Sequence, residues 1–172
     1  MLLRVLPLLR GPRGASFSSS SSPTAAAAGK ILEIGSVLSL SRRFSEADVL
    51  AYSKVSWDTN PVHFDPEVAS GVAGFLGPIV HGMLVASLFP RIVASHFPGA
   101  IYVSQTLQFK LPVYIDEEIT AQIQPVGIRE IKKRFIAKFS TKCFRDGGET
   151  PVLDGHATVI LPTLTLKSWP AT

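Results

Sequence analysis

Hydrophobic and polar residues alternate with a period of two through much of the second half of the chain, as in half-buried β-strands. Strands are expected over residues 37–41, 101–109, 118–124, 128–144 and 152–161. An Asp-Gly-Gly sequence at residues 146–148 predicts the turn before the last of these strands.

The segment between the first two strands carries helix signals instead. Ser45 is followed three residues later by Asp48, which predicts a capped helix that delivers the chain to Trp57. Asp65 before Pro66 predicts another helix start, in which the Asp65 side chain is the cap rather than a chemical group.

A long apolar run at residues 81–97 predicts the principal helix. Its leading half has polar side chains only at His81 and Ser87, so we expect it to be buried nearly all round. Pro90 predicts a kink, and a Pro-Gly pair at residues 98–99 ends the helix. One strand, a helical region and then several strands indicate the α+β class.

Composition divides the chain into a leader and one body. Residues 1–29 are rich in Leu, Arg, Ser and Ala and contain no acid, which is typical of a mitochondrial transit peptide and less so of a secretory signal. The first 30 residues contain four of the 17 basic residues, which leaves 13 basic against 13 acidic residues in the remainder. Residues 30–172, with a neutral charge balance, are long enough for one domain.

Outside residues 57–65, the chain shows few signs of a nucleophile, a metal site or a phosphate-binding loop. Cys143 is the only cysteine, which excludes an intramolecular disulfide and a cysteine zinc site and favours a buried or surface thiol over a nucleophile. The four histidines are not spaced as metal ligands. Neither a glycine-rich phosphate loop nor a G-x-S-x-G nucleophile elbow occurs.

Asp58 and His63 form the candidate acid/base pair. They lie five positions apart, which fits neither one helix face nor one strand face, so they converge only if the chain turns. Asn60 and Pro61 supply a rigid turn. The residues alone leave open whether this turn is catalytic or only structural.

The start of the long helix is the candidate oxyanion site. Backbone N–H groups at a helix start have no partner inside the helix, and Gly82 would let an acyl carbonyl approach the backbone. His81 could reach the site or serve packing and capping.

These two segments resemble the signature of a known family. The sequence D-x-N-P-V-H-x-D at residues 58–65, followed by P-I-V-H-G-M at residues 78–83, is similar to that of the MaoC-like (R)-specific enoyl hydratases and dehydratases. The resemblance runs from Phe44 to the last strand and, with the leader, is strongest to the mitochondrial members. The family pattern has glycine before the aspartate, where this chain has Trp57.

The resemblance implies a hot-dog fold, in which an antiparallel sheet wraps a long helix. It also implies reversible syn dehydration of (3R)-hydroxyacyl thioesters to trans-2-enoyl thioesters, with Asp58 and His63 catalytic. The Gly82 N–H would stabilise the thioester oxygen, while Asn60 and His81 would support the pair or bind substrate. No metal or redox cofactor is implied.

The resemblance extends to partners and location. The implied substrate carrier is acyl carrier protein or coenzyme A, in a homodimer of the mitochondrial matrix with no nucleic acid or membrane span. A basic stripe on one predicted strand is either a solvated face or a docking patch for that carrier; it comprises Lys132, Arg134, Lys138 and Lys142. An (R)-specific enoyl-CoA hydratase, a hot-dog thioesterase and a non-catalytic acyl- or RNA-binding module remain as alternatives.

Overall fold

The structure is a computed structural model that describes residues 30–167, with only the backbone described at Asp146. The predicted transit peptide at residues 1–29 lies outside the described residues and stays a prediction.

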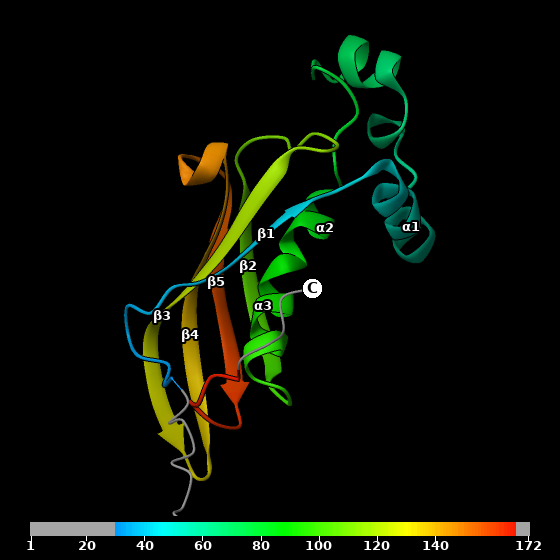
Figure 1. Cartoon of the computed structure of the whole chain (residues 1–172). Coiled ribbons are helices and arrows are strands. Elements are labelled where there is room, and N and C mark those ends of the chain that lie inside the picture. Colours follow the sequence, from blue (N-terminus) through cyan, green and yellow to red (C-terminus); the bar gives the residue numbers. More distant parts are fainter. Residues whose placement is uncertain (1–29, 168–172) are drawn as a thin grey trace, which may run out of the picture.

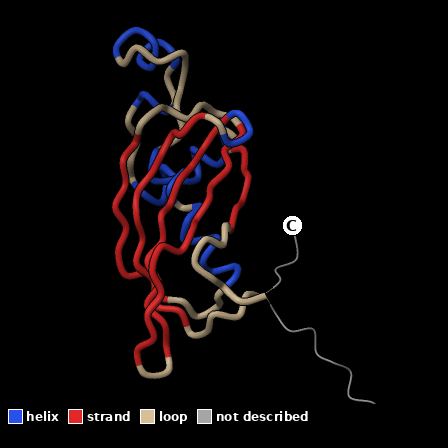
Figure 2. The backbone as a smooth tube through the Cα atoms, turned by 90° about the vertical axis from the view of Figure 1, so that its left-hand side faces the viewer, coloured by secondary structure: helices blue, strands red, loops and turns tan. Residues whose placement is uncertain are grey.

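An antiparallel sheet of five strands forms the larger part of the described chain (Figures 1 and 2). The strands are β1 (Leu38–Arg43), β2 (Ile101–Phe109), β3 (Glu118–Ile131), β4 (Arg134–Arg145) and β5 (Thr150–Leu161). Their order across the sheet is β1-β3-β4-β5-β2, so β1 and β2 are the two edges. The bounds of β2 are those expected from the alternating pattern, and the α+β class is confirmed.

The boundary between β3 and β4 differs from the sequence prediction. The single strand expected over residues 128–144 is wrong, because β3 continues to Ile131 and the chain reverses at Lys132, whose φ of 56° is left-handed. This turn contains no glycine or proline, the residues that usually mark one. β3 also passes through Pro125, where a bulge lets the strand continue without the N–H that proline lacks.

The first helix, α1 (Glu46–Ser56), begins as expected. The Ser45 hydroxyl accepts a hydrogen bond from the Asp48 N–H at 3.2 Å, and the Asp48 carboxylate accepts one from the Ser45 N–H at 3.0 Å. This reciprocal pair is the predicted capping box.

The long helix is divided into α2 (Gly82–Ala86) and α3 (Leu88–His96) by a turn residue, Ser87. This interruption lies one turn before Pro90, the residue at which a kink is expected. A proline ring crowds the carbonyl four residues earlier and cannot donate to it, which here is the carbonyl of Ala86.

The core lies between this helix and one face of the sheet (Figures 1 and 2). The largest fully buried side chains include Phe89 and Phe97 of the helical segment and Phe139 of β4. On the opposite face of β4, Lys138 and Lys142 are exposed. The other two residues of the basic stripe, Lys132 and Arg134, are exposed at the β3–β4 hairpin, and a docking role for this stripe remains a prediction.

Near one end of the sheet, α1 lies to the side of the strands, and the segment with two short helical turns, η1 (Pro61–His63) and η2 (Val68–Val72), extends past them (Figure 1). The predicted cap is present there, since the Asp65 carboxylate accepts hydrogen bonds from the N–H groups of Glu67 and Val68. Across residues 30–167 no helix combines the length and the apolar character needed to span a bilayer. The candidate site lies where this extension meets the start of α2.

Candidate active site

Asp58 follows directly from the end of α1. Trp57 ends that helix in the left-handed conformation, with φ 61°, and its N–H donates to the Ser53 carbonyl at 2.8 Å. The Asp58 Oδ1 atom then accepts a hydrogen bond from the Asn60 N–H at 3.2 Å, which closes the turn. The Asp58 side chain stays half exposed.

His63 is held by the segment that leads to α2. Its Nδ1–H donates to the Ile79 carbonyl at 2.8 Å, and the Ile79 N–H donates to the Val62 carbonyl at 3.2 Å. Because Nδ1 carries the proton, Nε2 of the neutral ring is a free base. That atom lies 3.8 Å from Asp58 Oδ2.

The predicted pair is therefore brought together, with a separation too long for a direct hydrogen bond. His63 is buried, and this burial lowers its pKa below the ordinary value of 6.5. The hydrogen bond to Ile79 acts in the opposite direction, nearby His81 lowers the pKa further, and the Asp58 carboxylate raises it. The net effect favours the neutral ring near physiological pH.

A third ionisable side chain, His81, completes the cluster. Its ring stacks on that of His63, with centroids 3.7 Å apart, and its Nε2–H donates to the main-chain carbonyl of Asp58 at 3.0 Å. Its side chain is 2% exposed, and the ring of Tyr52 lies 5.0 Å away.

The ligand atoms of Asp58, His63 and His81 all lie within 4.8 Å of one another, as in a metal site. The ring planes are inclined by only 23° with centroids 3.7 Å apart, however, so their in-plane lone pairs lie in two nearly parallel planes rather than meeting at one point. Zinc takes imidazole ligands that converge at about 2.0 Å. As they lie, these rings would have to reorient before both could bind one ion.

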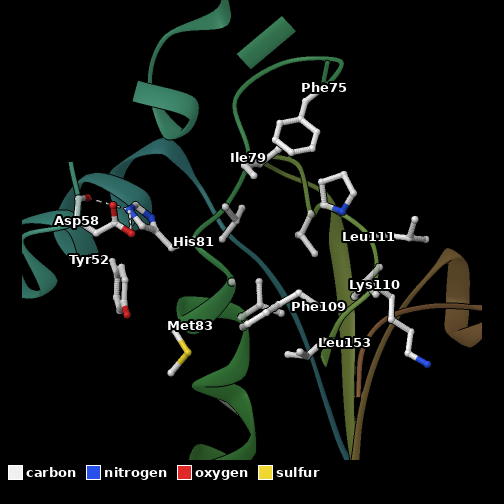
Figure 3. A pocket seen from close by; sticks show the side chains of 16 residues that line it. Tyr52, Asp58, Phe75, Ile79, His81, Met83, Phe109, Lys110, Leu111 and Leu153 are labelled. Atoms are coloured by element: carbon white, nitrogen blue, oxygen red, sulfur yellow. Dashed lines mark hydrogen bonds and ion pairs between the residues drawn. The ribbon is translucent and has the colours of Figure 1, made fainter. Parts of the chain in front are cut away.

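A pocket of about 450 Å³ runs along the start of α2 (Figure 3). Asp58, Tyr52 and His81 line one side, and Phe109, Lys110 and Leu153 line the other. Most of the remaining lining is apolar, which suits an acyl chain or a pantetheine arm. His63 instead lines a neighbouring hollow with Phe64 and Tyr114, so the pair lies at the boundary of the two.

Gly82 is the first residue of α2 and lines the same pocket as Asp58. Its Cα side is covered, because a β-carbon built there would lie 2.5 Å from Cε1 of Phe109. The approach expected at Gly82 is therefore limited to the N–H side of the residue. No local pattern marks Phe109, Tyr52 or Lys110 as pocket residues.

Two other candidates have local roles. The Asn60 side chain accepts a hydrogen bond from the Val62 N–H at 3.3 Å, and so holds the turn rather than the His63 ring. Cys143 is fully buried in β4, where burial raises the pKa of its thiol to about 12, so it is a core residue as expected.

The sequence matches the model of the MaoC like domain over residues 30–142. The chain is 58% identical over 151 residues to a mitochondrial 3-hydroxyacyl-[acyl-carrier-protein] dehydratase of Solanum lycopersicum, a match covering 88% of this chain and 87% of that protein. It is 45% identical over 133 residues to an (R)-specific enoyl-CoA hydratase of Aeromonas caviae, covering 76% of this chain and 96% of that protein.

Solved structures give the same relationship. The (R)-hydratase of A. caviae superposes with a TM-score of 0.69 at 43% identity, covering 76% of this chain and 98% of the other. An (R)-hydratase of Pseudomonas aeruginosa superposes with a TM-score of 0.67 at 30% identity, covering 82% and 92%. The predicted hot-dog fold is thereby confirmed.

Proposed function

Because the chain belongs to the family of MaoC-like dehydratases, we propose that it is a mitochondrial 3-hydroxyacyl-[acyl-carrier-protein] dehydratase. It is a hydro-lyase that interconverts (3R)-hydroxyacyl and trans-2-enoyl thioesters. The tomato relative and an Arabidopsis thaliana protein 53% identical over 157 residues carry the name of this activity.

One geometric observation carries the proposal within the site. The unprotonated Nε2 of His63 and the Asp58 carboxylate face each other at 3.8 Å. Such a gap lets one substrate hydroxyl or water contact both groups after a small adjustment. A buried imidazole whose pKa is lowered by burial, beside a half-exposed carboxylate, is suited to act as one half of an acid/base pair.

The pair moves two protons in each turnover. In dehydration it removes the C2 proton of the substrate, the C3–O bond breaks, and the departing hydroxyl takes a proton to leave as water. The electron pair of the C2–H bond becomes the new double bond. Asp58 and His63 act as one coupled unit in these transfers.

Negative charge that develops on the thioester oxygen needs a donor. The Gly82 N–H at the start of α2 borders the same pocket as Asp58 and is suited to this role. Asn60 supports the reaction indirectly by holding the turn between Asp58 and His63.

The substrate is an acyl thioester, and we favour acyl carrier protein over coenzyme A as its carrier. The identity to the two plant mitochondrial dehydratases is higher than that to the bacterial enoyl-CoA hydratase, which supports this choice. Enoyl-CoA hydration, the activity for which the A. caviae relative is named, remains the alternative. Both activities use the same chemistry, in opposite directions.

Both plant relatives are named as mitochondrial proteins, and this protein is mitochondrial as well. We place it in the matrix, as a homodimer. The leader-like composition of residues 1–29 supports import. The exposed edge of β2 supports pairing with a second copy, since an unpaired edge strand offers free N–H and C=O groups.

A direct assay tests the function. Purified protein is incubated with trans-2-enoyl groups on acyl carrier protein and on coenzyme A, and hydration is followed by loss of absorbance of the conjugated thioester. A chiral analysis should give only the (3R) product, with higher kcat/KM on the carrier protein. Release of free thiol without hydration would indicate a thioesterase instead.

A further inference from the structure

Main-chain carbonyls hold the two stacked imidazoles in opposite tautomers. The Ile79 carbonyl accepts the Nδ1–H of His63, which leaves Nε2 of His63 unprotonated. The Asp58 carbonyl accepts the Nε2–H of His81, so the neutral ring has its free nitrogen at Nδ1. Two rings that are face to face at 3.7 Å therefore have different hydrogen-bonding roles.

We propose that His81 is a positioning residue of the dehydratase reaction: its ring fixes the Asp58 main chain through the Nε2–H and keeps the stacked His63 ring in place as the free base. This inference rests on the proposed function of Asp58 and His63. It assigns His81 no contact with the reacting atoms.

The hydrogen bond to Asp58 joins two parts of the chain that are far apart in sequence. Asp58 follows α1, whereas His81 precedes α2, and the two segments have no helix or strand in common. The Asp58 turn is otherwise held by its own neighbours, through Ser56 and Asn60. His81 thus ties the Asp58 main chain to the helix whose first residue is Gly82.

Stacking also couples the charges of the rings. If His81 were protonated, its charge would oppose protonation of His63, and this proximity contributes to the lowered pKa of His63. Among the described residues, the titratable side chains that contact the His81 ring are Tyr52 of α1, Asp58 and His63 of η1. Oδ2 of Asp58 lies 4.0 Å from Nε2 of His81.

Packing alone does not account for a histidine at this position. Nδ1 of His81 is buried and has no hydrogen-bond partner among the described groups. A buried polar atom without a partner is unfavourable, and an apolar ring would fill the same space without that cost. The Nε2–H donor is what histidine adds over phenylalanine here.

The tautomers can be measured in the wild-type protein without an activity assay. Long-range ¹H–¹⁵N correlation spectra at neutral pH separate Nδ1–H from Nε2–H rings, and the four histidines can be assigned by single substitutions. We expect the Nδ1–H form for His63 and the Nε2–H form for His81. A His81 ring in the Nδ1–H form would overturn the proposal while leaving the dehydratase assignment intact.

Two variants separate the donor from the ring. His81→Phe keeps the stacked ring and loses the donor, so kcat/KM should fall about 10- to 100-fold, as for other supporting hydrogen bonds. His81→Gln carries an amide N–H near the position of Nε2 and should recover much of that loss. In the pH profile of kcat/KM for His81→Gln, the acidic limb should also move to higher pH, because an amide cannot become charged beside His63.

His156→Gln is the matched control, since His156 is exposed on β5 away from the site and its substitution should change neither quantity. Equal kcat/KM in His81→Phe and wild type, or equal losses in both His81 variants with an unmoved acidic limb, would refute the role. If His81→Phe fails to fold, the tautomer measurement and His81→Gln still decide the matter.

Discussion

The ring of Phe109 covers the backbone of Gly82, so closely that a β-carbon on Gly82 would meet Cε1 of Phe109 at 2.5 Å. Phe109 is the last residue of β2 and Gly82 the first of α2, so this contact joins the edge of the sheet to the start of the helix. Both residues line the pocket that contains Asp58. Glycine at this position is therefore a requirement of the pocket as well as of the helix start.

Gly82→Ala should impair activity more than stability. The obstructing atoms belong to the far end of a side chain that is 56% exposed, so the ring can move, at a cost of about 1–2 kcal/mol. The displaced ring then narrows the pocket beside Asp58. Urea unfolding and kcat/KM measured on the same preparation separate the two effects.

Gly71→Ala is the control for this substitution, because a β-carbon at Gly71 meets nothing within 4 Å. It should leave activity unchanged. Trimming the ring with Phe109→Ala in the Gly82→Ala background should restore part of the lost activity. Wild-type turnover in a folded Gly82→Ala protein would contradict the role given to this contact.

The catalytic pair should behave as a unit. Asp58→Asn and His63→Gln should each lower kcat by about 10²–10⁴-fold, the usual contribution of a general acid or base. The double variant should be little worse than either single one, since each step needs both groups. Steady-state kinetics measure these losses, on variants whose circular dichroism spectra match that of the wild-type protein.

Asp65→Asn provides a matched carboxylate control in the same segment. The Asp65 side chain accepts hydrogen bonds from the N–H groups of Glu67 and Val68, and an asparagine oxygen can replace it. Near-normal kcat in Asp65→Asn beside inactive Asp58→Asn would localise the chemistry. Substantial turnover in His63→Gln would exclude the proposed pair.

Burial of His63 makes folding stability depend on pH. The folded chain holds its ring below the ordinary pKa of 6.5, so between the two pKa values the unfolded chain binds more protons. Stability should therefore fall as the pH drops from about 7 through the lowered pKa, and this contribution should level off below it. Urea midpoints across that range measure the slope.

The fall of the urea midpoint with decreasing pH should be absent in His63→Gln and present in His156→Gln. Asp48, whose pKa is lowered by its hydrogen bonds to the Ser45 backbone, acts in a separate window. Its contribution is lost only as the pH falls below the ordinary carboxyl value of 3.8. An unchanged slope in His63→Gln would mean that the ring is not the titrating group.

Local signals predicted the elements that depend on local interactions. The capping box of Ser45 and Asp48 located the start of α1, and alternation located β2. The turn at Lys132 escaped prediction because left-handed lysine has no sequence signature, and the strand expected over residues 118–124 continues through Pro125. In each case the sheet, not the local sequence, decides the conformation.

In the candidate site, too, the sequence predicts the local relationships and not the long-range ones. The Asn60 turn predicted that Asp58 and His63 meet, because both lie on one short, rigid segment. The stacking of His81 on His63 depends on the pairing of Ile79 with Val62, and the contact of Phe109 with Gly82 depends on where β2 ends. Such relationships belong to the tertiary structure and carry no local signal.

Cys143 should be unreactive in the native protein. The thiol is fully buried, and burial raises its pKa to about 12, so very little thiolate exists at neutral pH. N-ethylmaleimide should leave activity unchanged and should label Cys143 only after urea unfolding, as read by mass spectrometry. Rapid native labelling with loss of turnover would place a reactive thiol in the mechanism.

The final prediction concerns assembly through β2. This strand is an edge of the sheet, and its exposed side chains include Ile101 at 49% and Val103 at 56%. An edge that is apolar and unprotected by charge is suited to pairing with a second copy. Phe109, which borders the pocket, is on the same strand, so dimer formation and activity should be linked.

Val103→Lys should weaken the dimer by placing a charge in that edge, and kcat/KM should fall with the fraction of dimer as protein is diluted. Val37→Lys is the matched control, because Val37 is 53% exposed and adjoins β1, the opposite edge. Light scattering coupled to size exclusion gives the mass, and activity is measured at the same concentrations. A fully active monomer would refute the linkage, and loss of the dimer in Val37→Lys alone would move the interface to β1.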